Sequence, residues 1–306
     1  MTTAVVATIL KNNSDVKQIA ATRMNASEPL LKQSAEILDK AIKAHQPYAK
    51  VLMFSGGGDS MAALQVCLVL GVKPDYILHV NTRTGIKETT EFVRLYVESI
   101  GIPYIEADAK DSYEQYVLRK GFFGVGTGQN SAHSYAYHVL KKSAYSHALS
   151  KHIRQGKRGR KILLINGARI AESNNRAKNL AGKEIRTDGD RINNVWVNVI
   201  HHWQKTDCQA LCGEQKCPIN PVNKELCRSG ECLCGTTQSQ QVRNEASAIY
   251  PEWGQWIDRL EARVKKKFFW GWGEPVPKQW ALEKRGQLRL FDADFQPMCH
   301  SCLENT

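Results

Sequence analysis

The chain has 306 residues, and its 42 Lys and Arg side chains outnumber its 30 Asp and Glu side chains, which gives a formal net charge of +12. No apolar stretch approaches the roughly 20 residues of a membrane span. The apolar run at residues 4–10 is short and lacks a preceding basic region, so we expect a cytoplasmic protein without a signal peptide or membrane contacts. The positive charge favours a polyanionic partner such as nucleic acid.

Residues 1–48 are predicted to form a mostly helical N-terminal extension. Within it, residues 34–44 carry apolar side chains at roughly helical spacing. No pattern in this extension indicates a chemistry, so we interpret it as a packing or partner-binding segment.

A buried strand, a glycine turn and a helix are predicted in succession between residues 51 and 71. Residues 51–54 are apolar without alternation, which is typical of a strand buried on both faces. Glycines occupy positions 56–58, and the apolar spacing becomes helical from Asp59 to Leu70, with Gly71 as the C-cap. Unpaired N–H groups and the positive end of the helix then meet at one spot, which favours phosphate binding. A glycine turn without a ligand is the alternative.

Further strands are predicted at residues 76–81, 103–109, 161–166 and 196–203. A helix with one apolar face follows the first of them and ends near Gly101. Strands that alternate with helices indicate parallel pairing. We therefore predict an α/β fold, a doubly wound parallel sheet of Rossmann-like type over residues 49–205, with a cysteine-rich C-terminal region over residues 206–306.

Basic residues and histidines precede and follow the strand at 161–166. His133 and His138 would touch phosphate or substrate, with ordinary surface histidines as the more common alternative. Residues 151–161 form a dense basic run, which is either a solvated loop or a contact to a phosphate backbone. After the strand, Arg169 and Arg176 are suited to neutralising charge on phosphates. Ser173 lies where a helix would begin, so helix capping is its alternative role.

Eight of the nine cysteines follow residue 200, and in a reduced compartment such a cluster indicates metal ligands more than disulfides. Two close pairs are predicted to form one site. The metal ligands are then Cys232, Cys234, Cys299 and Cys302, with Cys227 or His300 as a substitute. The spacing does not choose between zinc and an iron–sulfur cluster. Unliganded thiols are the alternative, and Cys67 is expected to be core packing.

Aromatic residues gather at positions 268–272, directly after Lys265, Lys266 and Lys267. Aromatic rings beside positive charges suit the stacking of nucleic-acid bases. A buried aromatic cluster that seals the cysteine-rich region is an equal alternative.

Four elements spread over residues 50–235 resemble the PP-loop ATP pyrophosphatases, the superfamily that includes PAPS reductase and the adenine nucleotide α-hydrolases. They are the Ser-Gly-Gly-x-Asp-Ser loop that begins at Ser55, the pair Glu88-Thr89, the Gly-x-Arg-x-x-Glu-Ser-x-x-Arg element at 167–176, and the Asn-Pro and cysteine segment after position 220. Asn81, Arg83 and Lys87 replace residues that PAPS-reductase-like proteins carry in the second element.

The resemblance implies a role for each residue that matches. The loop residues that would hold the departing pyrophosphate are Ser55, Gly56, Gly57, Gly58 and Ser60. Asp59 would help to place Mg²⁺, and Arg169 and Arg176 would neutralise charge. Asn81 and Gly167 complete the expected ATP-binding set. The resemblance also favours a 4Fe–4S cluster over Zn²⁺ at the cysteines.

The best fit is to the ATP pyrophosphatases of DNA phosphorothioation. ATP would be cleaved to AMP and pyrophosphate to activate a backbone phosphate oxygen, which a persulfide sulfur would replace. The sulfur would come from a cysteine desulfurase or another donor protein, and DNA is favoured over tRNA as the acceptor. Alternatives are a tRNA thiolation enzyme, a non-catalytic nucleotide- and metal-binding module, and a PAPS reductase. The last is disfavoured because the tail at 298–302 does not reproduce the reductase motif Glu-Cys-Gly-x-His.

Overall fold

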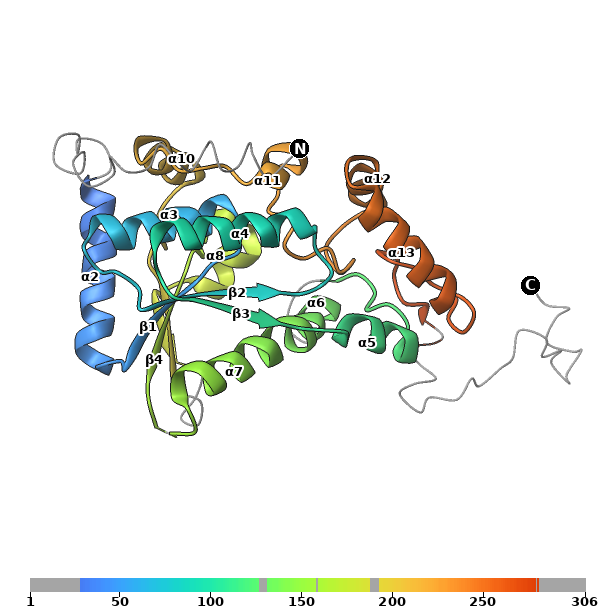
Figure 1. Ribbon diagram of the computed structural model, residues 1–306, viewed down its shortest axis with the longest axis horizontal. Coiled ribbons are helices and arrows are strands. Elements are labelled where there is room, and N and C mark those ends of the chain that lie inside the picture. The colour runs from blue at the N-terminus through green and yellow to red at the C-terminus, as the bar shows by residue number, and fades with distance from the viewer. Residues whose placement is uncertain (1–27, 127–130, 158, 188–192, 279, 281–306) are drawn as a thin grey trace, which may run out of the picture.

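A six-stranded sheet with the strand order β3-β2-β1-β4-β6-β5 is the centre of the computed structural model, which describes residues 28–126, 131–157, 159–187, 193–278 and 280 (Figure 1). Neighbouring strands pair in parallel except β5, which runs antiparallel to β6. The strands are β1 (Ala49–Met53), β2 (Tyr76–Asn81), β3 (Tyr104–Asp108), β4 (Ile162–Asn166), β5 (Ile185–Thr187) and β6 (Asn194–Asn198). The predicted parallel sheet is confirmed.

Helices connect the strands and extend beyond the sheet. In chain order the α-helices are α2 (Glu28–His45), α3 (Gly58–Val69), α4 (Lys87–Ile100), α5 (Ser112–Lys120), α6 (Ala132–Tyr137), α7 (Ser143–Leu149), α8 (Asn174–Leu180), α10 (Lys205–Glu214), α11 (Pro221–Leu226), α12 (Gln240–Ile249) and α13 (Pro251–Val264). Segments η2 (His138–Lys142) and η3 (Ser150–Arg154) are π-helical, and η4 (Ile170–Glu172) is a 3₁₀ turn. No helix of these described parts is long and apolar enough to cross a membrane.

The helix ends follow the predicted glycines. Gly71 has a φ of +68°, and the N–H of Val72 bonds to the carbonyl of Cys67 at 2.9 Å, which is the pattern of a Schellman cap. Gly101 ends α4 with a φ of +61°. Only glycine adopts this left-handed backbone without strain, so these positions fix where the two helices stop.

The two faces of the sheet are both covered, as the doubly wound prediction requires. Helices α2, α3, α4 and α10 pack on one face, around Leu52 and Ile165, while α7 packs on the other, around Val51 and Leu164. Figure 1 shows α3 and α4 on one side of the strands and α7 on the opposite side. Successive strand residues thus enter opposite cores.

The last predicted strand, at residues 196–203, is wrong in its boundaries. β6 ends at Asn198, and the chain then turns, with the N–H of His201 bonded to the carbonyl of Asn198 at 3.1 Å. The apolar run continues because Val199 and Trp203 pack against α2. There Ser34 donates to the carbonyl of Val199 at 2.7 Å and accepts from the Trp203 indole at 3.0 Å. Burial in a turn produced the same apolar pattern as a strand.

The C-terminal elements form a further core with α5 and α6. Trp270 and Trp272 are buried there, and their indole N–H groups bond to the carbonyls of Phe122 and Leu233 at 2.8 and 2.9 Å. Phe268 is buried as well, whereas Phe269 is 85% exposed. The interpretation of positions 268–272 as a buried cluster therefore applies to most of them, and Phe269 alone remains open for stacking.

The predicted domain boundaries stay predictions. Helices from outside residues 49–205 pack into the core of the sheet. α2, from the N-terminal extension, and α10, from the C-terminal region, both share the core of the sheet. The basic run lies at the amino end of β4: Arg160 covers the ring of Tyr48 at 3.8 Å, directly before β1. That edge is opposite to the carboxyl ends of the strands, where the glycine loop lies.

Candidate functional site

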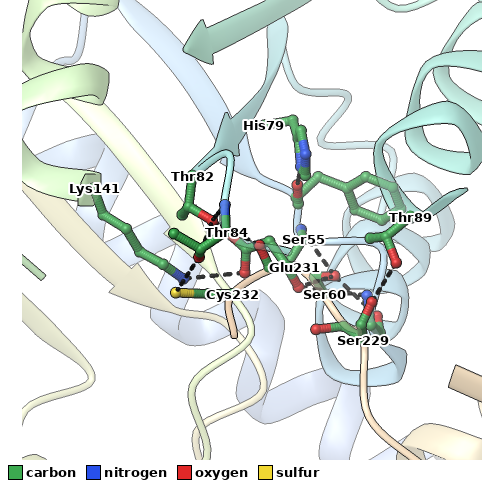
Figure 2. A network of polar contacts seen from close by, with 12 residues as sticks. Ser55, Ser60, His79, Thr82, Thr84, Thr89, Lys141, Ser229, Glu231 and Cys232 are labelled. Carbon is green, nitrogen blue, oxygen red and sulfur yellow. Dashed lines mark hydrogen bonds and ion pairs between the residues drawn. The ribbon is translucent and has the colours of Figure 1, made fainter. Parts of the chain in front are cut away.

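The glycine loop between β1 and α3 is shaped by its own serines. The Ser60 hydroxyl donates to the carbonyl of Gly57 at 2.9 Å and lies 3.1 Å from the Ser55 hydroxyl. The N–H of Ser55 in turn donates to Ser60 Oγ at 3.3 Å. Figure 2 shows the two serine side chains facing each other across the turn. Their hydrogen bonds therefore preorganise the loop.

Glycine occupies each of the three loop positions for a different physical reason. Gly56 has a φ of +75°, and a Cβ there would lie 2.8 Å from Val93, so the fold itself requires glycine. A Cβ at Gly57 would lie 3.2 Å from the side chain of Ser229. At Gly58, the first residue of α3, a Cβ would meet nothing within 4 Å. Space beside an N-terminal N–H of a 12-residue helix suits an anionic ligand.

Asp59, the residue after Gly58, forms an ion pair with Arg169, with Arg169 Nη2 at 2.9 Å from Asp59 Oδ2. Arg169 is 4% exposed and its Nε has no hydrogen-bond partner in the described part of the chain. Burial disfavours its charge, yet the hydrogen bond and the charge of Asp59 raise the pKa of Arg169 overall. A buried guanidinium with an unused donor is prepared for a second anion.

Gly167 allows this pair to form. A Cβ at Gly167 would lie 2.5 Å from the carbonyl oxygen of Asp59, so the loop after β4 touches the first turn of α3. We assign Gly167 to this close approach between backbones, while its predicted contact with the nucleotide stays a prediction.

Arg176 lies outside this pair. It is exposed on α8 and forms an ion pair with Glu172 at 3.4 Å, and the Ser173 hydroxyl accepts from its N–H as the N-cap of the helix. The capping role of Ser173 is therefore confirmed. Burial lowers the pKa of His133, and the charges of Lys141 and Arg176 lower it further. The His133 ring bonds to the hydroxyl of Thr236 at 3.0 Å.

Asn81, at the carboxyl end of β2, already has protein partners. Its amide donates to Glu106 at 2.9 Å and its carbonyl accepts from the N–H of Arg83 at 3.1 Å. Glu106 also forms an ion pair with Arg94 at 2.7 Å. Burial opposes ionisation, but these hydrogen bonds hold the pKa of Glu106 down at about 2. Asn81 therefore positions the turn after β2, and its contact with the nucleotide stays a prediction.

A buried asparagine far along the chain holds the glycine loop in place. The Asn220 amide donates to the carbonyl of Gly56 and to the hydroxyl of Thr89, each at 3.2 Å, and to the carbonyl of Ser229 at 3.3 Å. Thr89 is fully buried and donates to the carbonyl of Ser229. Thr89 thus acts in packing, and the Asn-Pro segment connects the loop to the cysteine segment.

A second polar network extends from β2 to the cysteines (Figure 2). Lys141 forms an ion pair with Glu231 at 3.0 Å, and the Thr84 hydroxyl lies 3.5 Å from the sulfur of Cys232. Burial disfavours the charge of Lys141, but Glu231 and Cys232 raise its pKa overall. Sequence reasoning missed this network because its partners are far apart in the chain: Lys141 and Glu231 are separated by 90 residues, and Thr84 and Cys232 by 148.

Cys232 and Cys234 are brought together, while Cys299 and Cys302 lie outside the described residues. A hydrogen bond from Cys234 lowers the pKa of Cys232, assisted by the charge of Lys141 and opposed by burial. Two adjacent thiols, one poised to ionise, fit half of a four-thiolate metal set. Cys227 is exposed at the end of α11. The complete ligand set stays a prediction; Cys67 is core, as expected.

Together these features are those of a PP-loop protein: a parallel sheet, a glycine-rich loop after its first strand, and an arginine from the loop after β4 that pairs with Asp59 at the start of α3. The chain belongs to the phosphoadenosine phosphosulfate reductase domain family, whose model matches residues 49–237. It is thereby a member of the adenine nucleotide α-hydrolase superfamily, as its sequence motifs suggest.

Solved structures resemble the chain at low identity. A PAPS reductase from Candida auris, in its phosphate complex, has a TM-score of 0.44 and 14% identity, over 73% of this chain and 92% of that one. An NMN synthetase from Francisella tularensis has a TM-score of 0.46 and 14% identity, over 89% and 100%. A U34-tRNA thiolase from Methanococcus maripaludis, with its 4Fe–4S cluster, has a TM-score of 0.38 and 16% identity, over 88% and 92%. No curated protein matches the sequence significantly.

Proposed function

We propose that the protein is an AMP-forming ATP pyrophosphatase that activates a nucleic-acid acceptor, preferably DNA, for the incorporation of sulfur. The observation that carries the proposal is the open space at Gly58 together with the ion pair of its neighbour Asp59 with the buried Arg169, whose Nε has no partner in the described residues. A phosphate chain placed there would meet N–H groups, a helix N-terminus and a guanidinium together. Membership of the family supports an adenosine nucleotide as the ligand.

Each residue of the proposed active site has its own role, which follows from its position. The backbone of Gly56 to Gly58 would hold the departing pyrophosphate, because the serines already fix the loop in shape. Arg169 would stabilise the charge that develops as the α–β bond breaks, and the exposed Arg176 would close over it from α8. Mg²⁺, with Asp59 as its protein ligand, would neutralise the phosphates when bound. Asp59 is one-third exposed, so it remains accessible despite its pairing with Arg169.

The cysteine segment supports sulfur chemistry at the same end of the sheet. Adenylation of a backbone phosphate oxygen by ATP releases pyrophosphate. The terminal sulfur of the donor's persulfide then attacks the phosphorus and releases AMP. A second thiol, supplied by excess cysteine, cleaves the remaining S–S bond, which leaves the phosphorothioate and a mixed disulfide of the donor. Cys232 and Cys234, with Cys299 and Cys302 or Cys227, would hold a 4Fe–4S cluster in preference to Zn²⁺. Such a cluster supplies a sulfur-handling centre when bound.

The charge of the chain supports a polyanionic acceptor. The net charge of +12 favours nucleic acid, and the exposed Phe269 follows three successive lysines. An exposed ring beside positive charge suits a splayed or single-stranded base. Lys265 is paired with Glu261, so Lys266 and Lys267 are the stronger candidates for phosphate contacts.

The test uses anaerobically purified protein with ATP, Mg²⁺, a cysteine desulfurase and cysteine. Pyrophosphate release is measured with DNA, with tRNA and without nucleic acid, and digested DNA is analysed for phosphorothioate by mass spectrometry. We expect release stimulated by DNA, phosphorothioate in the product, and loss of both in Asp59→Asn. Asp39→Asn is the matched control, because Asp39 pairs with Lys43 on the surface of α2.

Other outcomes would replace the proposal. Stimulation by tRNA alone, with sulfur in tRNA, would make it a tRNA thiolation enzyme. Sulfite release from PAPS with a thiol reductant, without ATP turnover, would make it a reductase. Tight ATP binding without turnover would make it a non-catalytic module.

A further inference from the structure

Two histidines and a glutamate converge where β5 meets β6. Glu184 directly precedes β5, and His201 and His202 lie in the turn after β6. The antiparallel register, with Ile185 opposite Val197, brings the start of β5 to the end of β6. One ligand atom from each of the three side chains lies within 4.8 Å of the others. Glu184 Oε1 is 3.4 Å from His202 Nε2.

His201 is the unusual member of this group. Its side chain is buried, with 1% of the residue exposed, and neither ring nitrogen has a hydrogen-bond partner within the described chain. An imidazole always offers at least one N–H donor, and its neutral form also offers a lone pair. Buried polar groups normally have a hydrogen-bond partner, so the ring nitrogens of His201 are available to bind a further group. The His202 ring packs edge-on against it, with 4.7 Å between centroids.

We propose that Glu184, His201 and His202 bind one divalent transition-metal ion of the Zn²⁺ type. Two imidazoles and a carboxylate are an established ligand set for such ions. With metal–ligand bonds of about 2.0–2.2 Å, neighbouring ligand atoms in a tetrahedron are about 3.3–3.6 Å apart. The 3.4 Å between Glu184 and His202 already matches one such edge. Three protein ligands leave one position for water or another ligand.

This site contains no cysteine, so it is separate from the thiolate set discussed above. It is tied by the backbone to the segment after β4 that carries Arg169, because the N–H of Ile170 bonds to the carbonyl of His201 at 3.0 Å. Ile170 directly follows Arg169. The backbone of Glu184 is also held in place, because the N–H of Asn198 bonds to the carbonyl of Glu184 at 2.9 Å. The bound ion fixes the turn that supports the segment after Arg169.

The probe is Co²⁺, titrated into the reduced, metal-free full-length chain by equilibrium dialysis and visible spectroscopy. Nitrogen and oxygen ligands give ligand-field bands without the thiolate charge-transfer band that cysteines produce. Binding at this site is therefore read separately from binding at the cysteines. The variants are His202→Ala and Glu184→Gln, whose side chains are 42% and 34% exposed and whose replacement leaves the core intact. His152→Ala, an exposed histidine on η3, is the matched control.

We expect one Co²⁺ equivalent without thiolate character in the wild-type chain and in His152→Ala. In each of the two site variants its affinity should fall at least tenfold, while the thiolate band stays unchanged. Equal affinity in the wild-type chain and both site variants would overturn the proposal. A wild-type chain in which all bound Co²⁺ shows thiolate charge transfer would overturn it as well. Neither readout depends on ATP turnover, so the outcome is independent of the proposed function.

Discussion

The phosphate site at Gly58 can be tested by adding one methyl group. In Gly58→Ala the new Cβ meets no protein atom within 4 Å, and the residue begins α3 without a positive φ. The free energy of unfolding should therefore stay within about 1 kcal/mol of the wild-type value, because alanine is the better helix former. A phosphate against the N–H of Gly58 would instead collide with the methyl group. Loss of one hydrogen bond to a charged group is about 1.5–3 kcal/mol, or roughly a 10- to 100-fold rise in Kd.

The assay is calorimetric titration with a nonhydrolysable ATP analogue and Mg²⁺, together with unfolding in guanidinium chloride. Gly213→Ala is the control, because Gly213 also lies in a helix, α10, and its Cβ would also meet nothing within 4 Å. We expect both variants to be as stable as the wild-type chain and only Gly58→Ala to bind weakly. Unchanged affinity in Gly58→Ala would refute the argument that this open space receives phosphate.

Substitutions of Gly167, Arg169 and Glu106 test three other contacts of the site and the sheet. Gly167→Ala places a Cβ 2.5 Å from the carbonyl oxygen of Asp59. The free energy of unfolding in urea should therefore fall by about 1–3 kcal/mol. An unchanged urea midpoint of unfolding would contradict the close approach of the two backbones. Arg169→Lys keeps the charge but loses the planar fork, so kcat for ATP should fall about 100-fold or more, and full activity would exclude Arg169 from the chemistry. The pKa of Glu106 is about 2 in the folded chain, against an ordinary value of 4.5. Its carboxylate therefore stabilises the fold above about pH 4.5, and this contribution is lost as the pH falls towards 2. Glu106→Gln should cost about 1–2 kcal/mol at pH 7 after solvent screening and should flatten that acid decline in urea titrations; parallel curves would contradict the assignment.

The sheet could be predicted because parallel strands buried on both faces are continuous apolar runs. The same signal failed at Val199 and Trp203, where an apolar run belongs to a turn packed on α2. An apolar pattern reports burial, and it reports a strand only where the backbone also pairs. The β6 boundary therefore required the structure.

Some features of the candidate site could be predicted from the sequence, and others could not. The glycine loop and Arg169 lie in short contiguous motifs, so the sequence alone marks them. The contact of Asn220 with Gly56 joins residues 164 positions apart, and the pairing of Lys141 with Glu231 spans 90. Such contacts depend on where the topology brings loops together, and neither composition nor spacing records that. The thiol pair Cys232 and Cys234 was predicted from its spacing, but Lys141 beside it was not.

In the proposed function, the loop at 55–60 and Arg169 direct cleavage between the α and β phosphates of ATP. The most direct measurement is chromatographic identification of the nucleotide products from anaerobically purified protein with ATP and Mg²⁺, in the presence of DNA. We expect AMP and pyrophosphate in equal amounts from the wild-type chain, neither product above background from Asp59→Asn, and about 100-fold less of both from Arg169→Lys. ADP and phosphate as the products, or AMP formation that survives both substitutions, would contradict it.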